Sequence, residues 1–507
     1  MKPLTVVIPY RPIPFFEKTL LSLMKSALVG RVVIISQEPV HFKMDKSHVL
    51  VAGPIFSHEI LSQMISEIRT NYLLLLPEAR EIAIQPKALE RTLKKAESTK
   101  AGLVYSDFYD ESERGKTLRP LNDYQPGSVR DDFDFGVMTL FSVSAIRKAL
   151  KKYGAVSEVK FAGLYDLRLK LSIDHSITHL KEPLYSVIGN VGAIHELPLQ
   201  EKLFAYLDPQ NRAVQKEMEA VFTDYLKKIG AYLPPSFKEV EQAATSFPVE
   251  ASVVIPVRNR RETIAEAVKS ALSQDADFLF NVIVVDNHST DGTTAILSDL
   301  ASQYSRLKHT IPVRTDLAIG GCWNEALYAQ DCGRYAVQLD SDDLYSSPHT
   351  LQTMVGMLRQ GNYAMAIGSY TLVDSNLKEI PPGLIDHREW TDENGHNNAL
   401  RINGLGAPRA FNTGLMRKIG FLNVSYGEDY AAALRICREY RIGRIYESLY
   451  FCRRWSGNSD AGLSIEEANR NDAFKDQIRT EEILERQKMA KGIGQRASEK
   501  HQMPSTK

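Results

Sequence analysis

Apolar runs alternate with helical periodicities along the second half of the chain. The apolar runs are typical of buried strands and cover residues 252–257, 281–285, 335–339 and 363–370. Between them, apolar residues at helical spacing predict helices over residues 264–272, 293–303 and 321–329, and another that begins near residue 348. This alternation predicts an α/β fold with a mostly parallel sheet and helices on both of its faces.

The start of this pattern repeats the start of the chain. Residues 5–11 read TVVIPYR and residues 252–258 read SVVIPVR. Weaker matches follow in the same order. Residues 182–185 (EPLY) match residues 447–450 (ESLY), and a helix opening at Asn211 matches one opening at Asn469. Chance explains one such match, but several in one order favour two copies of one fold. We therefore expect domains over residues 1–232 and 250–486, a linker over residues 233–249, and a basic, disordered tail over residues 487–507.

Composition and charge limit the class of protein. The 507 residues include 62 basic and 62 acidic side chains, so no net charge attracts nucleic acid or an anionic membrane. The four cysteines have no CxxC spacing, which favours reduced thiols over a zinc site or a disulfide framework. The sequence has neither a signal-peptide pattern at its start nor an apolar run long enough to span a membrane. We expect a cytoplasmic protein that binds no nucleic acid, and a peripheral membrane contact is compatible with this expectation.

Three carboxylates follow the strand expected at residues 335–339. They belong to Asp340, Asp342 and Asp343, with only Ser341 between them. The carboxyl ends of strands are where α/β sheets bind ligands, and the period of an extended segment points Asp340 and Asp342 to the same side. Because Mg²⁺ is usually held by one or two carboxylates and the phosphates of its substrate, this stretch predicts a nucleoside diphosphate ligand. An acidic turn ahead of a helix is the structural alternative.

Four motifs of the second half occur in a characteristic order. They are residues 254–259 (VIPVRN), 284–293 (VVDNHSTDGT), 339–343 (LDSDD) and 427–430 (GEDY). Together they resemble family-2 glycosyltransferases of the GT-A fold, which transfer a sugar from a nucleotide sugar with inversion at the anomeric carbon. The resemblance covers most of residues 251–455. With the repeat, it implies two tandem GT-A domains of the α/β class, a nucleotide-sugar donor, and a glycan or lipid-linked acceptor.

The resemblance also implies roles for single residues at the donor site. Asp342 would bind Mg²⁺ or Mn²⁺ directly, Asp340 would support the ribose or the water shell of the cation, and Asp286 would bind the nucleobase. For Asp286, a cap of the following turn is the structural alternative. The remaining positions implied for the nucleotide sugar are Pro256, Val257, Arg258, Asn259, Asn324 and Ser341.

Glu428 and Asp429 precede an alanine-rich helical stretch. A helix N-terminus favours ionised carboxylates, and inversion by a single displacement needs a base on the acceptor's side of the sugar. The resemblance makes Asp429 this base and Glu428 a residue that contacts the acceptor or orients the site. A plain pair of helix-capping acids is the structural alternative.

One position departs from the family pattern. Many members carry a histidine, often a metal ligand, where this chain has Trp455. Because an indole cannot serve as a metal ligand, we expect a weaker metal site or a transfer that depends less on metal. Arg453 and Arg454 precede it and are suited to bidentate contacts with a diphosphate, with an ordinary surface pair as the alternative.

The first half keeps the strand pattern without the acids. No aspartate follows the strand expected at residues 31–35. Glu78 with Arg80 stands where the second half has Asp340, Asp342 and Asp343, which we call the acidic row. A lone carboxylate beside an arginine is a poor cation site, because the arginine competes for it. Of the pair Glu428 and Asp429, only Asp429 has a counterpart in the first half, and this counterpart is Asp166. We expect an inactive glycosyltransferase-like domain, and a second active site with other ligands is the less favoured alternative.

Two rival functions fit less well than a glycosyltransferase of polysaccharide or surface-glycan synthesis. A sugar-1-phosphate nucleotidyltransferase also combines an α/β sheet with bound metal. It normally carries a glycine-rich loop after its first strand, whereas residues 257–261 (VRNRR) contain no glycine. A non-catalytic carbohydrate-binding scaffold is disfavoured by the retained Asp340, Asp342 and Asp429.

Overall fold

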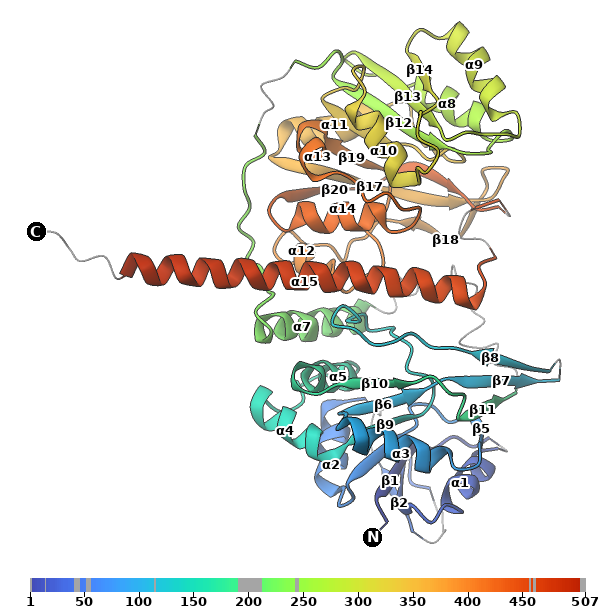
Figure 1. Cartoon of the computed structure of the whole chain (residues 1–507), viewed down its shortest axis with the longest axis vertical. Helices are drawn as coiled ribbons and strands as arrows, with labels where there is room; N and C mark the ends of the chain where they lie inside the picture. Colours follow the sequence, from blue (N-terminus) through green and yellow to red (C-terminus); the bar gives the residue numbers. More distant parts are fainter. Residues whose placement is uncertain are drawn as a thin grey trace, which may run out of the picture. The chain divides into compact units, whose positions relative to one another are not determined.

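The computed structural model divides the chain into two compact units (Figure 1). Unit 1 comprises Met1–Tyr232 and Ser464–Lys507, and unit 2 comprises Leu233–Leu463. The structure describes residues 2–13, 15–40, 46–51, 56–113, 115–189, 212–241, 246–455, 457–458 and 462–501, and only the backbone of residues 492–501. In these ranges, no helix combines the length and the apolar character needed to cross a membrane.

Unit 2 begins with parallel strands joined by helices. Its first elements are β12 (Ala251–Val257), α8 (Ile264–Leu272), β13 (Phe280–Asp286), α9 (Thr293–Gln303), β14 (Leu307–Thr310), α10 (Ile319–Tyr328) and β15 (Tyr335–Gln338). Every residue of β13 is buried, as expected of a strand covered on both faces. α8 buries the apolar face that its periodicity predicts. The strand and helix positions predicted for this part of the chain are confirmed.

The sheet of unit 2 changes direction after β15. The following elements are β16 (Leu344–Tyr345), α11 (Thr350–Gln360), β17 (Tyr363–Val373), β18 (Glu379–Ile385), α12 (Gly395–Asn398), β19 (Arg409–Asn412), α13 (Thr413–Ile419), α14 (Glu428–Cys437) and β20 (Arg441–Arg453). The strand order is β14-β13-β12-β15-β19-β17-β20-β16, with β18 paired to β17. β19 lies antiparallel between β15 and β17, because the chain enters it from the edge at which β17 ends. The α/β class is confirmed, but the sheet is mixed rather than mostly parallel.

Unit 1 contains a seven-stranded sheet in the order β10-β6-β9-β4-β1-β2-β3 and a smaller sheet in the order β5-β11-β7-β8. Val6 and Ile8 of β1 belong to one core cluster and Val7 to another, as alternation across a sheet buried on both faces requires. The elements are β1 (Leu4–Pro9), α1 (Phe16–Met24), β2 (Val29–Ser36), β3 (Ser47–Val51), α2 (His58–Glu67), β4 (Tyr72–Leu75), β5 (Glu81–Ile84), α3 (Ala88–Thr99), β6 (Leu103–Ser106), β7 (Phe108–Ser112), β8 (Gly115–Arg119), β9 (Thr139–Ser142), α4 (Val143–Tyr153), α5 (Gly163–Asp174), β10 (Ile177–Leu180), β11 (Tyr185–Ile188) and α7 (Arg212–Lys228).

The main sheets of the two units correspond strand by strand. Read from β3 and from β14, both sheets place seven strands in the same order along the chain and across the sheet. Both have an antiparallel strand, β9 or β19, inserted among parallel neighbours. Each of these strands ends in a side chain that caps the next helix, since Ser142 accepts a hydrogen bond from the N–H of Ala145, and Asn412 accepts one from the N–H of Leu415. Positions in one sheet therefore have counterparts in the other.

The last helix differs from the expected division of the chain. We expected residues up to 486 in the second domain and a disordered tail after them, but α15 (Ile465–His501) groups with unit 1. Its buried Asp476 accepts hydrogen bonds from Ser128 and Arg479, both at 2.8 Å, and lies 3.6 Å from Arg130. Polar contacts of this kind join α15 to unit 1. The pattern of apolar residues in the sequence does not predict such contacts. Residues 502–507 lie outside the described residues.

Candidate active site

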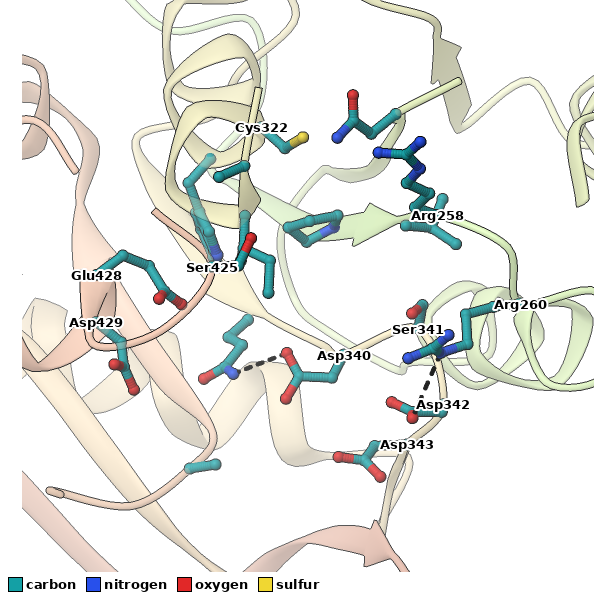
Figure 2. A pocket seen from close by; sticks show the side chains of 18 of the residues that line it. Arg258, Arg260, Cys322, Asp340, Ser341, Asp342, Asp343, Ser425, Glu428 and Asp429 are labelled. Carbon is teal, nitrogen blue, oxygen red and sulfur yellow. Dashed lines mark hydrogen bonds and ion pairs between the residues drawn. The ribbon is translucent and has the colours of Figure 1, made fainter. Parts of the chain in front are cut away.

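A cavity of about 500 Å³ lies in unit 2 at the carboxyl ends of β12 and β15 (Figure 2). This edge of an α/β sheet is the usual place for a ligand. Residues from the end of β12, the acidic row after β15 and the N-terminus of α14 form its walls. Of the residues predicted for the site, the cavity brings together Pro256, Val257, Arg258, Asp340, Ser341, Asp342, Glu428, Asp429 and Arg454.

The acidic row is crowded and buried. Burial raises the pKa of Asp343 well above its usual range, and the charges of Asp340 and Asp342 raise it further. Burial and the charge of Asp342 also raise the pKa of Asp340, although Gln338 donates a hydrogen bond to it at 2.9 Å. A positive ligand relieves repulsion of this kind. The row is therefore suited to a cation or to a cationic group.

Asp342 meets three nitrogen donors of the protein. Its Oδ2 lies 3.3 Å from Nε1 of Trp455, 3.3 Å from Nδ2 of Asn458 and 3.6 Å from Nε of Arg260, and Figure 2 shows the contact with Arg260. No group of three histidine, cysteine or acidic side chains in the described part of the chain is arranged to hold a metal ion. Asp340 and Asp342 consequently fit Mg²⁺ or Mn²⁺ only in company with the oxygens of a bound phosphate.

The arginines near the acidic row have different tasks. Arg258, Arg260 and Arg454 line the cavity, and guanidinium groups are suited to pairing with an anion. Arg453 does not line it. Its Nε donates to the carbonyl of Asp342 at 2.6 Å and its Nη1 pairs with Glu266, so the protein itself uses this side chain. The sequence prediction included Arg453 and omitted Arg260, although Arg260 lies two positions after Arg258 in one loop.

Asp286 does not reach the cavity. Its carboxylate is fully buried and accepts hydrogen bonds from the N–H of Ser289 at 3.0 Å and the hydroxyl of Thr294 at 2.5 Å. Burial alone would raise the pKa of Asp286, but these hydrogen bonds and the contact with His309 lower it. The structure therefore shows the turn-capping role that the sequence left as the alternative.

Asn259 and Asn324, which were predicted to bind the nucleotide sugar, form hydrogen bonds to loops of the protein. Oδ1 of Asn259 accepts a hydrogen bond from the N–H of Thr290 at 2.8 Å. The side-chain amide of Asn324 exchanges two hydrogen bonds, each of 2.9 Å, with the backbone of Phe421. Neither asparagine lines the cavity. Both fix loops that surround it.

Asn287, which the sequence prediction omitted, does line the cavity. Its Nδ2 donates to the carbonyl of Leu317 at 2.7 Å, while its buried Oδ1 has no hydrogen-bond partner among the described residues. A buried acceptor without a partner costs free energy of about 1–3 kcal/mol. A ligand N–H or O–H would satisfy it. Its place beside Asp286 at the end of β13 was the available sequence signal.

Glu428 and Asp429 form the wall opposite Arg258 and Arg260, with Asp340 between the two sides (Figure 2). They open α14 after Gly427, whose φ of +80° is a left-handed conformation that favours glycine. Nη2 of Arg409 lies 2.5 Å from Oδ2 of Asp429. Burial, reinforced by the charge of Asp429, raises the pKa of Glu428 to about 8.

The acids that remain in unit 1 are paired with cations of the same unit. Nε of Arg80 lies 2.7 Å from Glu78, as the sequence suggested. Nζ of Lys170 lies 2.6 Å from Asp166, and both side chains are almost completely buried. The burial of Asp166 shields its carboxylate from an incoming hydroxyl group or cation, and Arg80 occupies one oxygen of Glu78.

The chain is similar to known glycosyltransferases. Residues 252–419 match the family model described as glycosyl transferase family 2. The chain is 32% identical over 122 residues to a putative glycosyltransferase EpsE of Bacillus subtilis, with 24% of this chain and 43% of that protein covered. It is 30% identical over 118 residues to a GalNAc(5)-diNAcBac-PP-undecaprenol beta-1,3-glucosyltransferase of Campylobacter jejuni, with 23% and 37% covered. The structure of S. aureus TarS 1-349 in complex with UDP-GlcNAc matches with a TM-score of 0.35 and 23% identity, over 47% of this chain and 72% of that one.

Fold and cavity define unit 2 as an α/β domain with a cavity at the carboxyl ends of its strands. Residues 252–419 of this domain match the family model of glycosyl transferase family 2. The resemblance inferred from the four motifs is thereby confirmed for this segment. The matches span less than half the length of either curated relative.

Proposed function

We propose that unit 2 transfers a sugar from a nucleotide-diphosphate sugar to a hydroxyl acceptor with inversion. One observation carries the proposal: a single cavity presents arginines and an acidic row on one side and the pair Glu428 and Asp429 on the other. Such an arrangement separates a diphosphate leaving group from a proton acceptor, as a single displacement requires.

The donor side suits a nucleoside diphosphate. Arg258, Arg260 and Arg454 can pair with phosphate oxygens through charge-assisted hydrogen bonds. Asp340 and Asp342 would hold Mg²⁺ or Mn²⁺ together with those oxygens. When bound, the cation supplies positive charge that stabilises the departing diphosphate. The free Oδ1 of Asn287 is an acceptor for the nucleobase or ribose.

The acceptor side suits removal of a proton. The acceptor oxygen attacks the anomeric carbon while the bond from that carbon to the donor phosphate breaks, and the nucleoside diphosphate leaves. Asp429 takes the hydroxyl proton, and its contact with Arg409 favours the ionised carboxylate that this step needs. Glu428, with its raised pKa, is suited to hold a proton beside it and to donate a hydrogen bond to the acceptor.

Unit 1 is proposed to be a second copy that has lost this chemistry and captures the acceptor or stabilises the chain. The shared strand order and the ion-paired Glu78 and Asp166 support this division. The acceptor is proposed to be a glycan or lipid-linked glycan in the cytoplasm, because one relative is named as a glucosyltransferase acting on an undecaprenol-linked glycan.

The test is a panel of nucleotide sugars incubated with the full chain, with release of nucleoside diphosphate as the readout. One donor should be turned over, and Asp342→Ala should abolish the release. Pyrophosphate released from a nucleoside triphosphate and a sugar 1-phosphate would instead support the nucleotidyltransferase. No turnover and no binding of any donor would favour the scaffold.

A further inference from the structure

Two side chains outside the predicted site residues connect the two sides of the cavity. Nη1 of Arg409 donates to Oε1 of Gln338 at 3.0 Å, and Nε2 of Gln338 donates to Oδ1 of Asp340 at 2.9 Å. The other end of the same guanidinium holds Asp429 at 2.5 Å. We call Arg409 and Gln338 the polar bridge. It runs from the carboxylate on the acceptor side to a carboxylate on the donor side, and all four residues line the cavity.

The sheet itself places the bridge. Gln338 ends β15 and Arg409 begins β19, and these antiparallel strands pair Val337 with Ala410 one position earlier. Directly opposed residues of antiparallel strands present their side chains on the same face at close range. Gln338 is buried, and its amide is used at both ends, as acceptor and as donor. Such a side chain has a single useful orientation, so the bridge is a rigid connection.

Unit 1 offers an internal comparison at the same register. Val254 pairs with Gln338 in unit 2, whereas the corresponding Val7 pairs with Leu75 in unit 1. Leu75 in turn pairs with Thr139, which corresponds to Arg409. The bridge positions are thus a leucine and a threonine, which cannot form this connection.

The ends of the bridge are changed in unit 1 as well. Two positions after Leu75 stands Pro77, where unit 2 has Asp340. Asp166, the counterpart of Asp429, is held by Lys170 of its own helix at 2.6 Å. The frame of the sheet is therefore kept without the bridge where the acids of the site are lost. This pattern argues that the fold does not need the bridge and that the site does.

We propose that Arg409 and Gln338 are positioning residues that fix Asp429 relative to Asp340, and thereby the acceptor relative to the donor. This rests on the proposed glycosyltransferase function. The carboxylates of Asp429 and Asp340 repel each other across the cavity, and the positive charge of Arg409 offsets this repulsion. Two nitrogens of its planar guanidinium group contact Asp429 and Gln338, which fixes the geometry of the connection. Misplacement of reacting groups by about 1 Å can cost about 10²-fold in rate. Loss of the bridge should therefore lower turnover without lowering donor affinity.

The experiment compares the full-length wild type with Gln338→Met, Arg409→Lys, Arg409→Ala and the double variant of Gln338→Met and Arg409→Lys. Gln338→Met keeps the size and burial of the side chain but removes both hydrogen bonds. We expect kcat to fall about 10- to 100-fold, with donor KM and the Kd for nucleoside diphosphate within about twofold of wild type. Arg409→Lys keeps the positive charge but lacks the two separate donor nitrogens of the guanidinium group. It should retain more activity than Arg409→Ala. The double variant should lose less than the product of the single losses, because both changes break one connection.

Gln274→Met is the matched control. Gln274 is equally buried, with hydrogen bonds to Ser347 and Leu351, but lies outside the cavity. It should lower the melting temperature and leave kcat unchanged. Unchanged kcat in both bridge variants, or a loss equal to that of Gln274→Met, would overturn the proposal, as would a loss confined to donor affinity. If wild type turns over no donor, the proposed function fails and the bridge assignment falls with it; an active wild type with neutral variants overturns the bridge alone.

Discussion

The indole Nε1 of Trp455 lies 3.3 Å from Oδ2 of Asp342. The indole donates a hydrogen bond but offers no lone pair to a cation. Because the family resemblance implies a histidine at this position, we expect the proposed cation site to depend on phosphate oxygens for its remaining ligands. Trp455→His should supply the missing ligand.

We therefore expect Trp455→His to bind Mn²⁺ with nucleoside diphosphate about tenfold more tightly than wild type. Trp455→Phe removes the N–H without adding a ligand and is the control. Calorimetric titration of Mn²⁺ into the chain saturated with nucleoside diphosphate gives the comparison. Equal affinity in the histidine and phenylalanine variants would show that position 455 does not face the cation.

Asp429→Asn tests the proton acceptor. The change keeps the size of the side chain but removes its basic oxygen, so kcat should fall on the order of 10² or more. Donor affinity should stay near that of wild type, because the residue lines the cavity on the side that we propose for the acceptor. Asp299→Asn on the exposed face of α9 is the control. Retained turnover in Asp429→Asn would leave only the helix-capping role.

Glu428→Gln tests the raised pKa of Glu428. Burial and the charge of Asp429 raise the pKa of Glu428 to about 8, whereas in the unfolded chain a glutamic acid titrates near pH 4. The native state thus binds the proton more tightly, and the free energy of unfolding falls as pH rises between these two values. The variant lacks this contribution and should gain stability relative to wild type as pH rises from about 5 to about 8, by roughly 1–3 kcal/mol. Denaturant unfolding at several pH values measures it, and a constant difference would rule out the raised pKa.

The sequence predicted those parts of the fold that depend on local patterns. The strands and helices before residue 340 follow from apolar periods, and the acidic row follows from its position after a strand. The N-terminal acids of α14 were found by their motif. Each of these signals lies within a few consecutive residues.

The parts that were missed depend on long-range pairing. Gln338 and Arg409 meet because β19 lies antiparallel beside β15, and the two residues are far apart in the chain. Asp286 was expected in the site, yet local hydrogen bonds with Ser289 and Thr294 use its carboxylate. α15 groups with unit 1, and its polar contacts, such as the hydrogen bond from Ser128 to Asp476, cannot be read from an apolar period in the sequence. None of these relationships follows from spacing alone.

Asp166→Asn tests the division between the two units. Asp166 is buried against Lys170 at 2.6 Å and also accepts a hydrogen bond from the N–H of Ser157. Removing one partner of a buried pair typically costs about 3–5 kcal/mol, because the other charge stays buried. We expect lower stability and unchanged donor affinity. Asp174→Asn, which breaks an exposed pair with Lys152, is the control and should cost much less. Loss of a donor site in Asp166→Asn would make unit 1 a second transferase.

Titration of the full chain with uridine or guanosine diphosphate and Mn²⁺ tests the central claim most directly. The cavity of unit 2 predicts one nucleotide per chain, with stabilisation by about 2.7 kcal/mol at a hundred times the Kd. Asp342→Ala should weaken this binding at least about tenfold, because it removes a carboxylate from the proposed cation site. Asp299→Ala should leave it unchanged. Two nucleotides per chain, or equal affinity in wild type and Asp342→Ala, would contradict the account.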